Sequence, residues 1–373
     1  MTNLASRIDD APAPIRTGWR GTELHLPPNS RELRPLSIGA VSIGFPVVQA
    51  ALSGYSDQAM RLVARRLGAS YTLAEVMLER FVLDLKDRHK TRRHLALAEE
   101  DHPIGGQLMG ASPEDFGPAA KKLVAAGFDV IDINFGCPVK SAAEGCRGGY
   151  HLGQPDRALE IISRTREAVP QEVPVTLKMR RGIDDSSESH DNFFRILDGA
   201  FERGLAAVTV HGRTVAQKYN GPSNWDFLRA VKRHVGTRTI LGSGDLFTPV
   251  ACLEMLHYTG VDGVSVARGA IGNPWIFTQV RALAAGLTPL QPDLSEQRRV
   301  LEMHCALSVE ARGFAGTLPT MRLFGIKYSR LHPEAASVRS AFALARTLAD
   351  WRGVLDEWYP PTMVLANPLA SAL

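Results

Sequence analysis

The side chains best suited to chemistry lie at the ends of six consecutive apolar runs in the middle of the chain. They are amide, thiol, amine, guanidinium, imidazole, hydroxyl and carboxylate groups: Gln107, Asn134, Cys137, Lys178, Arg180, His211, Arg213, Ser243, Asp245 and Arg268. One such residue is often a satisfied core group. Six repeats of the same placement instead indicate one shared site.

The runs themselves predict the scaffold of that site. From about Val41, β-branched or apolar segments alternate with helical patterns, which is typical of a parallel sheet with helical crossovers. Eight strands are predicted, at 46–51, 70–74, 104–108, 130–134, 174–179, 207–211, 239–242 and 263–267. Helices are predicted at 113–126, with Ser112 as N-cap, and at 227–234, after Asn224. The fold class is therefore α/β, a (β/α)8 TIM barrel, whose chemistry lies at the carboxyl ends of the strands.

Three segments are expected along the chain. Residues 1–35 are punctuated by proline and predict a flexible leader, and residues 36–285 form the barrel. After 275 the alternation stops, and helices are predicted at 295–312, 320–331 and 333–359, so that 290–373 forms a small helical bundle with a short tail. Residues 312–352 carry seven basic side chains and two acidic ones; a solvated helix face is the default explanation.

Composition narrows the class of protein. The 373 residues are 45% hydrophobic and 22% charged, as in ordinary folded proteins, and the net charge of +4 permits a polyanionic partner. An apolar run of ~18 residues and a signal peptide are both missing, so we expect a cytoplasmic protein with no membrane partner, and a monomer. The four cysteines form no CxxC pair, which predicts no metal site and leaves a functional cysteine to act as a thiol.

The last two strand ends favour a phosphorylated cofactor. Ser243-Gly244-Asp245 and Ala267-Arg268-Gly269 each lead toward a helix, where barrels bind phosphate on backbone N–H groups. With no GxGxxG loop and no partner set for a lysine aldimine, flavin mononucleotide (FMN) fits best. Lys178 would place positive charge beside N1 and O2 of the ring. Gln107 and Asn134 would bond the ring edge or the substrate; the alternative for Lys178 is pairing with a carboxylate.

Four motifs together resemble the tRNA-dihydrouridine synthases over roughly 36–359. They are Asp132-Ile133-Asn134-Phe135-Gly136-Cys137-Pro138-Val139-Lys140, Val175-Thr176-Leu177-Lys178-Met179-Arg180, Val210-His211-Gly212-Arg213-Thr214 and Arg268-Gly269-Ala270-Ile271-Gly272-Asn273-Pro274-Trp275-Ile276-Phe277. The resemblance implies that Cys137 is the general acid. It also implies a set of flavin contacts: Ala51, Leu52, Ser53, Gln107, Lys178, His211, Ser243, Gly244, Asp245, Ala267 and Arg268.

The implied reaction reduces the C5=C6 bond of a uridine in tRNA. Reduced flavin N5 delivers hydride to C6, and Cys137 delivers a proton to C5 from the opposite face. A thiol suits this task because it is mainly protonated at neutral pH. The resemblance also implies NADPH or NADH as a transient reductant.

A uridine stacked inside tRNA must be extruded to reach the barrel, and Lys and Arg would hold the phosphates around it. The candidate substrate-binding residues are Asn134, Lys140, Arg180, Arg213, Arg322, Lys327 and Arg330. Individual basic residues, and the run 86–93, could equally be solvent-facing charge.

The chain departs from the family pattern around the expected flavin pocket. It has Ala50-Ala51-Leu52-Ser53-Gly54 where Ala-Pro-Met-Ala-Gly is usual, Ser243 for Asn, Ala267 for Gly, and an altered segment at 145–152. We interpret it as a divergent member. Two alternatives stay open: a flavin oxidoreductase of a small pyrimidine or dihydroorotate-type substrate, and a flavin-free RNA-binding protein.

Overall fold

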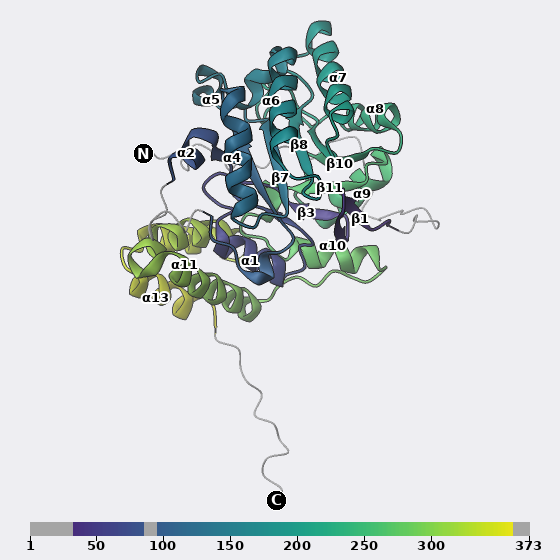
Figure 1. Ribbon diagram of the computed structural model, residues 1–373. Helices are drawn as coiled ribbons and strands as arrows, with labels where there is room; N and C mark the ends of the chain where they lie inside the picture. The colour runs from purple at the N-terminus through teal and green to yellow at the C-terminus, as the bar shows by residue number, and fades with distance from the viewer. Residues whose placement is uncertain (1–32, 86–94, 361–373) are drawn as a thin grey trace, which may run out of the picture. The chain divides into compact units, whose positions relative to one another are not determined.

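The computed structural model describes residues 33–85 and 95–360 (Figure 1). Most of the expected leader, the basic run 86–93 and the C-terminal tail lie outside the described residues.

The central element is a closed barrel of parallel strands. Its strands are β3 (Val47–Gln49), β4 (Thr72–Leu73), β6 (Ile104–Met109), β7 (Val130–Phe135), β8 (Val175–Arg180), β9 (Ala207–His211), β10 (Thr239–Ser243) and β11 (Gly263–Val266). The strands pair in the order β4-β3-β11-β10-β9-β8-β7-β6. Because β6 also pairs with β4, these eight strands close into a ring. A short ninth strand, β5 (Met77–Leu78), pairs with the end of β6. The predicted TIM barrel is confirmed, with a strand at each of the eight expected places.

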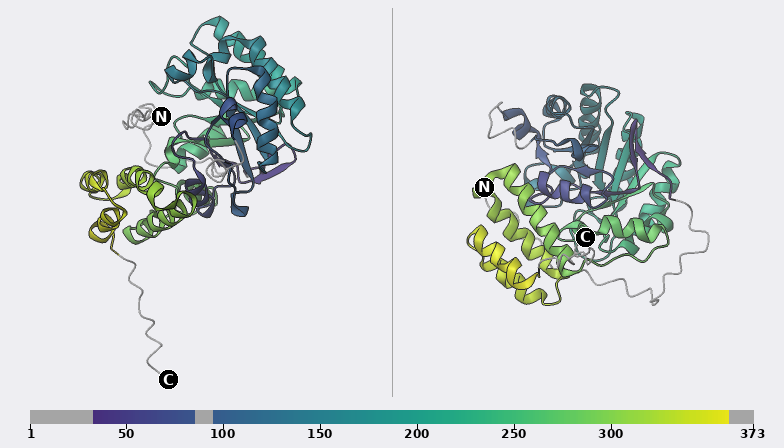
Figure 2. Two further views of the ribbon diagram at one scale, coloured as in Figure 1. Left: turned by 60° about the vertical axis from the view of Figure 1, so that its left-hand side comes forward. Right: turned by 90° about the horizontal axis from the view of Figure 1, so that it is seen from below.

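Helices lie outside the strands (Figures 1 and 2). They are α1 (Gln58–Arg66), α2 (Glu79–Asp84), α4 (Pro113–Ala125), α5 (Lys140–Glu144), α6 (Pro155–Ala168), α7 (Ser187–Glu202), α8 (Trp225–Val235), α9 (Pro249–Thr259) and α10 (Ile276–Ala284), with 3₁₀ turns η2 (Glu99–Asp101), η3 (Gly148–Gly153) and η4 (Arg268–Ala270). Asn224 caps α8 by accepting a hydrogen bond from the Phe227 amide. Ser112 is the N-cap residue of α4, but its side chain makes no capping bond. Pro113 already occupies the first turn there, and Glu114 adds charge that favours the helix start.

A β-hairpin that the sequence did not predict precedes the barrel. It consists of β1 (Leu36–Ile38) and β2 (Val41–Gly44), joined by a turn in which Gly39 has a φ of 57°. Leu36, Ile38 and Ile43 are buried in one apolar cluster with Val130 and with other residues of the barrel interior. Because Val130 starts β7, the hairpin covers the end of the barrel opposite the carboxyl ends of the strands.

The remaining helices form a second compact unit, made of 271–273 and 290–360 within the described residues. It contains α11 (Leu294–Tyr328), η5 (Ser329–Leu331), α12 (Ala335–Leu344) and α13 (Leu348–Trp358). The helices predicted at 295–312 and 320–331 are the two helical segments of α11, separated at Gly313, whose φ of 70° is not helical. The helix predicted at 333–359 is instead two, because Thr347 and Asp350 form a capping box that starts α13. Phe342 and Trp351 are buried in this unit's core.

Candidate active site

The pairing register brings the predicted strand-end residues to one end of the barrel. Asn134 on β7 lies beside Lys178 on β8, and Arg180 lies beside His211 on β9. His211 in turn lies beside Ser243 on β10. Side chains predicted separately from six strand ends therefore share the mouth where TIM barrels carry their chemistry.

The loop that carries Cys137 is anchored from three directions. The Asn134 side-chain oxygen accepts hydrogen bonds from the amides of Gly136 at 2.9 Å and Cys137 at 3.1 Å. Arg180 Nε donates to the Gly136 carbonyl at 2.9 Å, and the Gly149 amide donates to the Cys137 carbonyl at 3.1 Å. The side chain of Cys137 is partly exposed, so a fixed backbone presents an accessible thiol.

Beneath this loop lies a chain of polar side chains that sequence reasoning missed in part. Asn134 Nδ2 donates to Gln107 Oε1 at 2.7 Å, and Gln107 Nε2 donates to Asp132 Oδ2 at 2.6 Å. The other Asp132 oxygen accepts the Thr176 hydroxyl at 2.6 Å. A signal for Asp132 was present: it precedes Asn134 by two residues, so both side chains point to the same side of β7.

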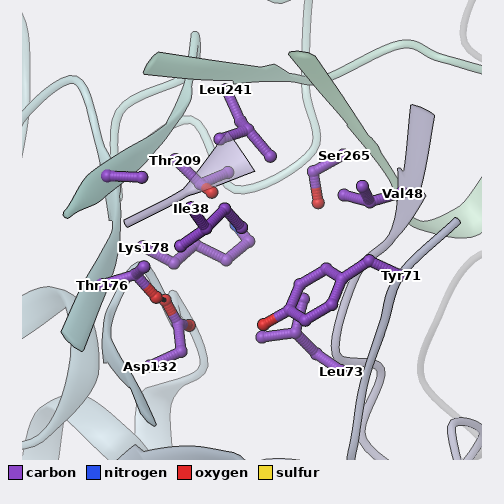
Figure 3. Close-up of a pocket in the computed structure, with 11 residues that line it drawn as sticks. Ile38, Val48, Tyr71, Leu73, Asp132, Thr176, Lys178, Thr209, Leu241 and Ser265 are labelled. Atoms are coloured by element: carbon purple, nitrogen blue, oxygen red, sulfur yellow. Dashed lines mark hydrogen bonds between the residues drawn. The ribbon is translucent and has the colours of Figure 1, made fainter. Parts of the chain in front are cut away.

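Lys178 lines a small cavity inside the barrel together with Asp132, Thr176 and Tyr71 (Figure 3). Within the described residues its amine forms no hydrogen bond or ion pair, so pairing with a carboxylate, the alternative reading of this lysine, is not what the structure has. Burial, and after it the positive charge of Arg180, lowers the pKa of Lys178 to about 8, while the charge of Asp132 acts in the opposite direction. The amine is thus a cation held without a partner.

His211 is neutral at physiological pH. Burial, followed by the positive charges of Arg180 and Lys178, lowers its pKa well below the usual value for histidine. Its Nδ1 accepts the Arg213 backbone amide at 3.1 Å, so in the neutral ring the proton is on Nε2. His211 therefore offers one N–H donor among several cations.

The loop after β10 has two consecutive residues with positive φ. Gly244 and Asp245 have φ values of 115° and 62°, and their N–H groups donate to no acceptor within the described residues. A Cβ added to Gly269 would lie 2.0 Å from the Leu246 carbonyl oxygen, so the turn after β11 approaches this loop as closely as glycine permits. The Ser243 hydroxyl donates to the Ser265 carbonyl at 3.1 Å, and the Ser243 carbonyl accepts the Gly212 amide at 3.3 Å.

Arg213 is held inside this region, with none of its side chain exposed. It pairs with Asp245 at 2.6 Å and donates from Nε to the Gly221 carbonyl at 2.8 Å. Its Nη1 group has no hydrogen-bond partner in the described structure. A buried guanidinium with one unused donor group is suited to an anion placed beside it.

Arginine and aromatic side chains form a second cluster at the mouth. The Arg268 guanidinium lies 4.4 Å from the ring centre of Tyr219 and 5.1 Å from that of Phe247, and Arg180 lies 5.6 Å from Tyr219. Arg180 also donates to the Thr214 carbonyl at 2.8 Å. Burial lowers the pKa of Arg180 to about 10, so it remains a cation at neutral pH. Tyr219, 41% exposed, was not predicted, because nothing in its spacing sets it apart from other loop residues.

The other predicted residues do not take part in the contacts described above. Ala51, Leu52 and Ser53 follow β3, where the Leu52 amide donates to the Ser56 hydroxyl at 2.8 Å. Lys140 starts α5, is 86% exposed and lies 3.5 Å from Glu144. The predicted contacts on the helical unit lie on α11 and η5: Arg322, Lys327 and Arg330.

Neither a metal-binding cluster nor a membrane-spanning helix occurs in the described ranges. No group of three or more His, Cys, Asp or Glu side chains there could hold a metal ion. No helix among the same residues is long and apolar enough to cross a membrane.

The model of the dihydrouridine synthase (Dus) family matches residues 48–356. A probable tRNA-dihydrouridine synthase of Rickettsia conorii is 30% identical over 329 residues, covering 88% of this chain and 97% of that protein. The tRNA-dihydrouridine synthase B of Klebsiella pneumoniae is 33% identical over 290 residues, covering 77% and 87%.

Solved structures show the same barrel at low sequence identity. Morphinone reductase in complex with tetrahydroNAD has a TM-score of 0.51 and 15% identity, with 71% of this chain and 93% of that chain covered. Histamine dehydrogenase from Rhizobium sp. 4-9 has a TM-score of 0.55 and 13% identity, and the match spans 73% of this chain and 51% of that protein. At these identities the likeness establishes the fold alone.

Proposed function

Because the chain belongs to the dihydrouridine synthase family, we propose that it reduces the C5=C6 bond of a uridine in tRNA, with FMN as cofactor and NADPH or NADH as reductant. The observation that carries the proposal is the anchored loop that presents the thiol of Cys137 at the mouth of a TIM barrel. Morphinone reductase, whose solved complex contains tetrahydroNAD, shares this barrel.

The residues at the mouth fit a phosphorylated flavin. The unused N–H groups of Gly244 and Asp245, with the unpaired Nη1 of Arg213 and the cation of Arg268 nearby, suit the phosphate. The unpartnered Lys178 amine and the Nε2–H of His211 suit the electron-rich edge of the ring. When bound and reduced, the flavin would supply the hydride that adds to C6 of the uridine.

The remaining predicted flavin contacts are more limited by their existing bonds. Both ends of the Gln107 amide are already engaged, so only one N–H of Nε2 is left for the ring. Ala51, Leu52, Ser53, Ser243 and Ala267 would contribute mainly contact surface, because the Leu52 amide and the Ser243 and Ala267 carbonyls already form hydrogen bonds.

Cys137 would act as the proton donor. Its thiol would give the proton to C5 of the uridine, and the resulting thiolate would regain a proton from solvent, because the side chain is partly exposed. Asn134 has one N–H left after its bond to Gln107, and this group would orient the base. Arg180 already fixes the Cys137 loop, so it would position the thiol as well as add positive charge for the substrate.

Binding of the tRNA would extend beyond the mouth. Lys140 is exposed beside the Cys137 loop and would meet a phosphate near the extruded uridine. Arg322, Lys327 and Arg330 would contact the body of the tRNA from the helical unit, with Arg213 holding the cofactor pocket rather than the RNA. A monomer acting in the cytoplasm stays the expectation for this enzyme.

The deciding assay supplies purified protein with FMN, NADPH or NADH, and an unmodified tRNA transcript. We expect uridine to gain two hydrogen atoms, detected by mass spectrometry of the digested RNA, and we expect Cys137→Ala to abolish this gain while flavin stays bound. Turnover of free uridine or dihydroorotate but not of tRNA would assign a small-molecule reductase. A colourless protein that binds tRNA without turnover would assign a flavin-free RNA-binding protein.

A further inference from the structure

Resting on the proposed function, we propose that Asp132 is a positioning residue that sets the orientation of the Cys137 loop through Gln107 and Asn134. Four hydrogen bonds connect the Asp132 carboxylate to the backbone amides of Gly136 and Cys137.

The direction of every bond in this series follows from its first member. An ionised carboxylate can only accept, so the NH2 end of the Gln107 amide must face Asp132 and its oxygen must face Asn134. The NH2 end of Asn134 then faces Gln107, which turns its oxygen toward the two loop amides. If the first amide were reversed, Asn134 would turn an NH2 group toward the N–H of Cys137, and the loop would lose its anchor.

The surroundings of Asp132 make a purely structural role a poor explanation. Asp132 is 3% exposed and lines a cavity inside the barrel with Thr176, Lys178 and Tyr71 (Figure 3). Burial raises the pKa of Asp132, while the hydrogen bonds from Thr176 and Gln107 lower it. A buried carboxylate is costly, and an apolar side chain of similar size is often at least as stabilising at such a place.

Thr176 provides a sharp test because its hydroxyl can donate or accept. In Asp132→Asn, the new NH2 group can donate to the Thr176 oxygen, and the remaining oxygen still accepts from Gln107. The series can then keep its direction with every group paired. In the double variant Asp132→Asn with Thr176→Val, keeping that direction leaves the NH2 group without an acceptor, so the direction is less strongly favoured.

The experiment compares Asp132→Leu, Asp132→Asn, Thr176→Val and the double variant in flavin-loaded protein. We expect both single variants Asp132→Asn and Thr176→Val to form dihydrouridine within about threefold of the wild-type rate. We expect the double variant and Asp132→Leu to be slower by about tenfold or more, equivalent to ~1.4 kcal/mol. Asp129→Leu is the matched control, because it removes a carboxylate that bonds the Ile104 amide at the other end of the strand.

A second readout does not depend on the reaction. The rate at which iodoacetamide alkylates Cys137, followed by peptide mass spectrometry, reports how the loop presents the thiol. We expect the double variant and Asp132→Leu to change this rate, and the two single variants and Asp129→Leu to leave it unchanged. If Asp132→Leu does not fold, comparing the double variant with its two parent variants still tests the positioning role of Asp132.

The two proposals fail in different ways. Wild-type protein that forms no dihydrouridine would overturn the proposed function, and the alkylation rates would then judge Asp132 alone. A double variant whose turnover and alkylation equal those of its parents would overturn the role of Asp132 and leave the proposed function intact.

Discussion

Replacing Lys178 by methionine should stabilise the flavin-free protein at neutral pH. The barrel lowers the pKa of Lys178 from 10.5 to about 8, chiefly by burial, so the folded state opposes the charge that the unfolded chain carries freely. At about 1.36 kcal/mol per pKa unit, the cost of keeping the cation folded is about 3 kcal/mol at pH 7. This figure is an upper bound, because the side chain is partly exposed and its attraction to Asp132 is lost as well.

The pH dependence has a definite sign. Below pH 8 both states hold the proton, and the folded state bears the whole cost. Between about 8 and 10.5 the unfolded chain keeps a proton that the folded chain has released, so wild-type stability rises with pH. The advantage of Lys178→Met should therefore shrink from pH 7 to pH 9.5.

Urea denaturation of flavin-free protein at these two pH values measures both effects. Lys140→Met is the control: Lys140 is 86% exposed, so removing its charge should change the free energy of unfolding little. Adding FMN should reverse the order of the Lys178 pair, because the ligand stabilises only a protein that binds it well. A Lys178→Met protein no more stable than wild type at pH 7, or an advantage that does not shrink at pH 9.5, would refute this reasoning.

Three further substitutions test other parts of the molecule. Gly148→Ala should cut dihydrouridine formation about tenfold or more and lower the melting temperature by about 2–4 °C, because φ is 60° there and the new Cβ would lie 2.8 Å from that of Cys137. Asp101→Asn should lower the free energy of unfolding in urea by about 3–5 kcal/mol, since it strands the buried cation of Arg61, now paired at 3.0 Å. Gly325→Ala should destabilise the helical unit by about 1–3 kcal/mol in calorimetry, with flavin absorbance unchanged, because its Cβ would meet the Phe342 ring at 2.5 Å.

Strand ends were predictable because parallel strands align their polar termini. The period of two in β7 and β8 was enough to put Asn134 and Lys178 on one face, and the register then makes them neighbours. The same rule places Asp132 on that face, because it precedes Asn134 by two residues and lies beside Gln107 in register.

Other features depend on contacts between segments far apart in sequence. The hairpin at 36–44 forms because its apolar residues can cover the barrel interior, which local propensity does not encode. Tyr219 belongs to the mouth because its ring contacts Arg268, a residue of another loop. Gly148 matters because a Cβ there would meet that of Cys137. The break between the two helices expected at 295–312 and 320–331 was predictable, because Gly313 there has a φ of 70° that glycine adopts readily.

Positively charged side chains outnumber carboxylates at the mouth of the barrel. Four buried or half-buried cations converge there, Lys178, Arg180, Arg213 and Arg268, and their positive charges all lower the pKa of His211. In the described structure, Asp132 acts on Lys178, and Asp245 acts on Arg213 and Arg268. Such a cluster of cations destabilises the folded protein unless an anion binds beside it. The pKa of Lys178, lowered first by burial and then by Arg180, and the unpaired Nη1 of Arg213 are two expressions of that cost, and a bound anion would offset both.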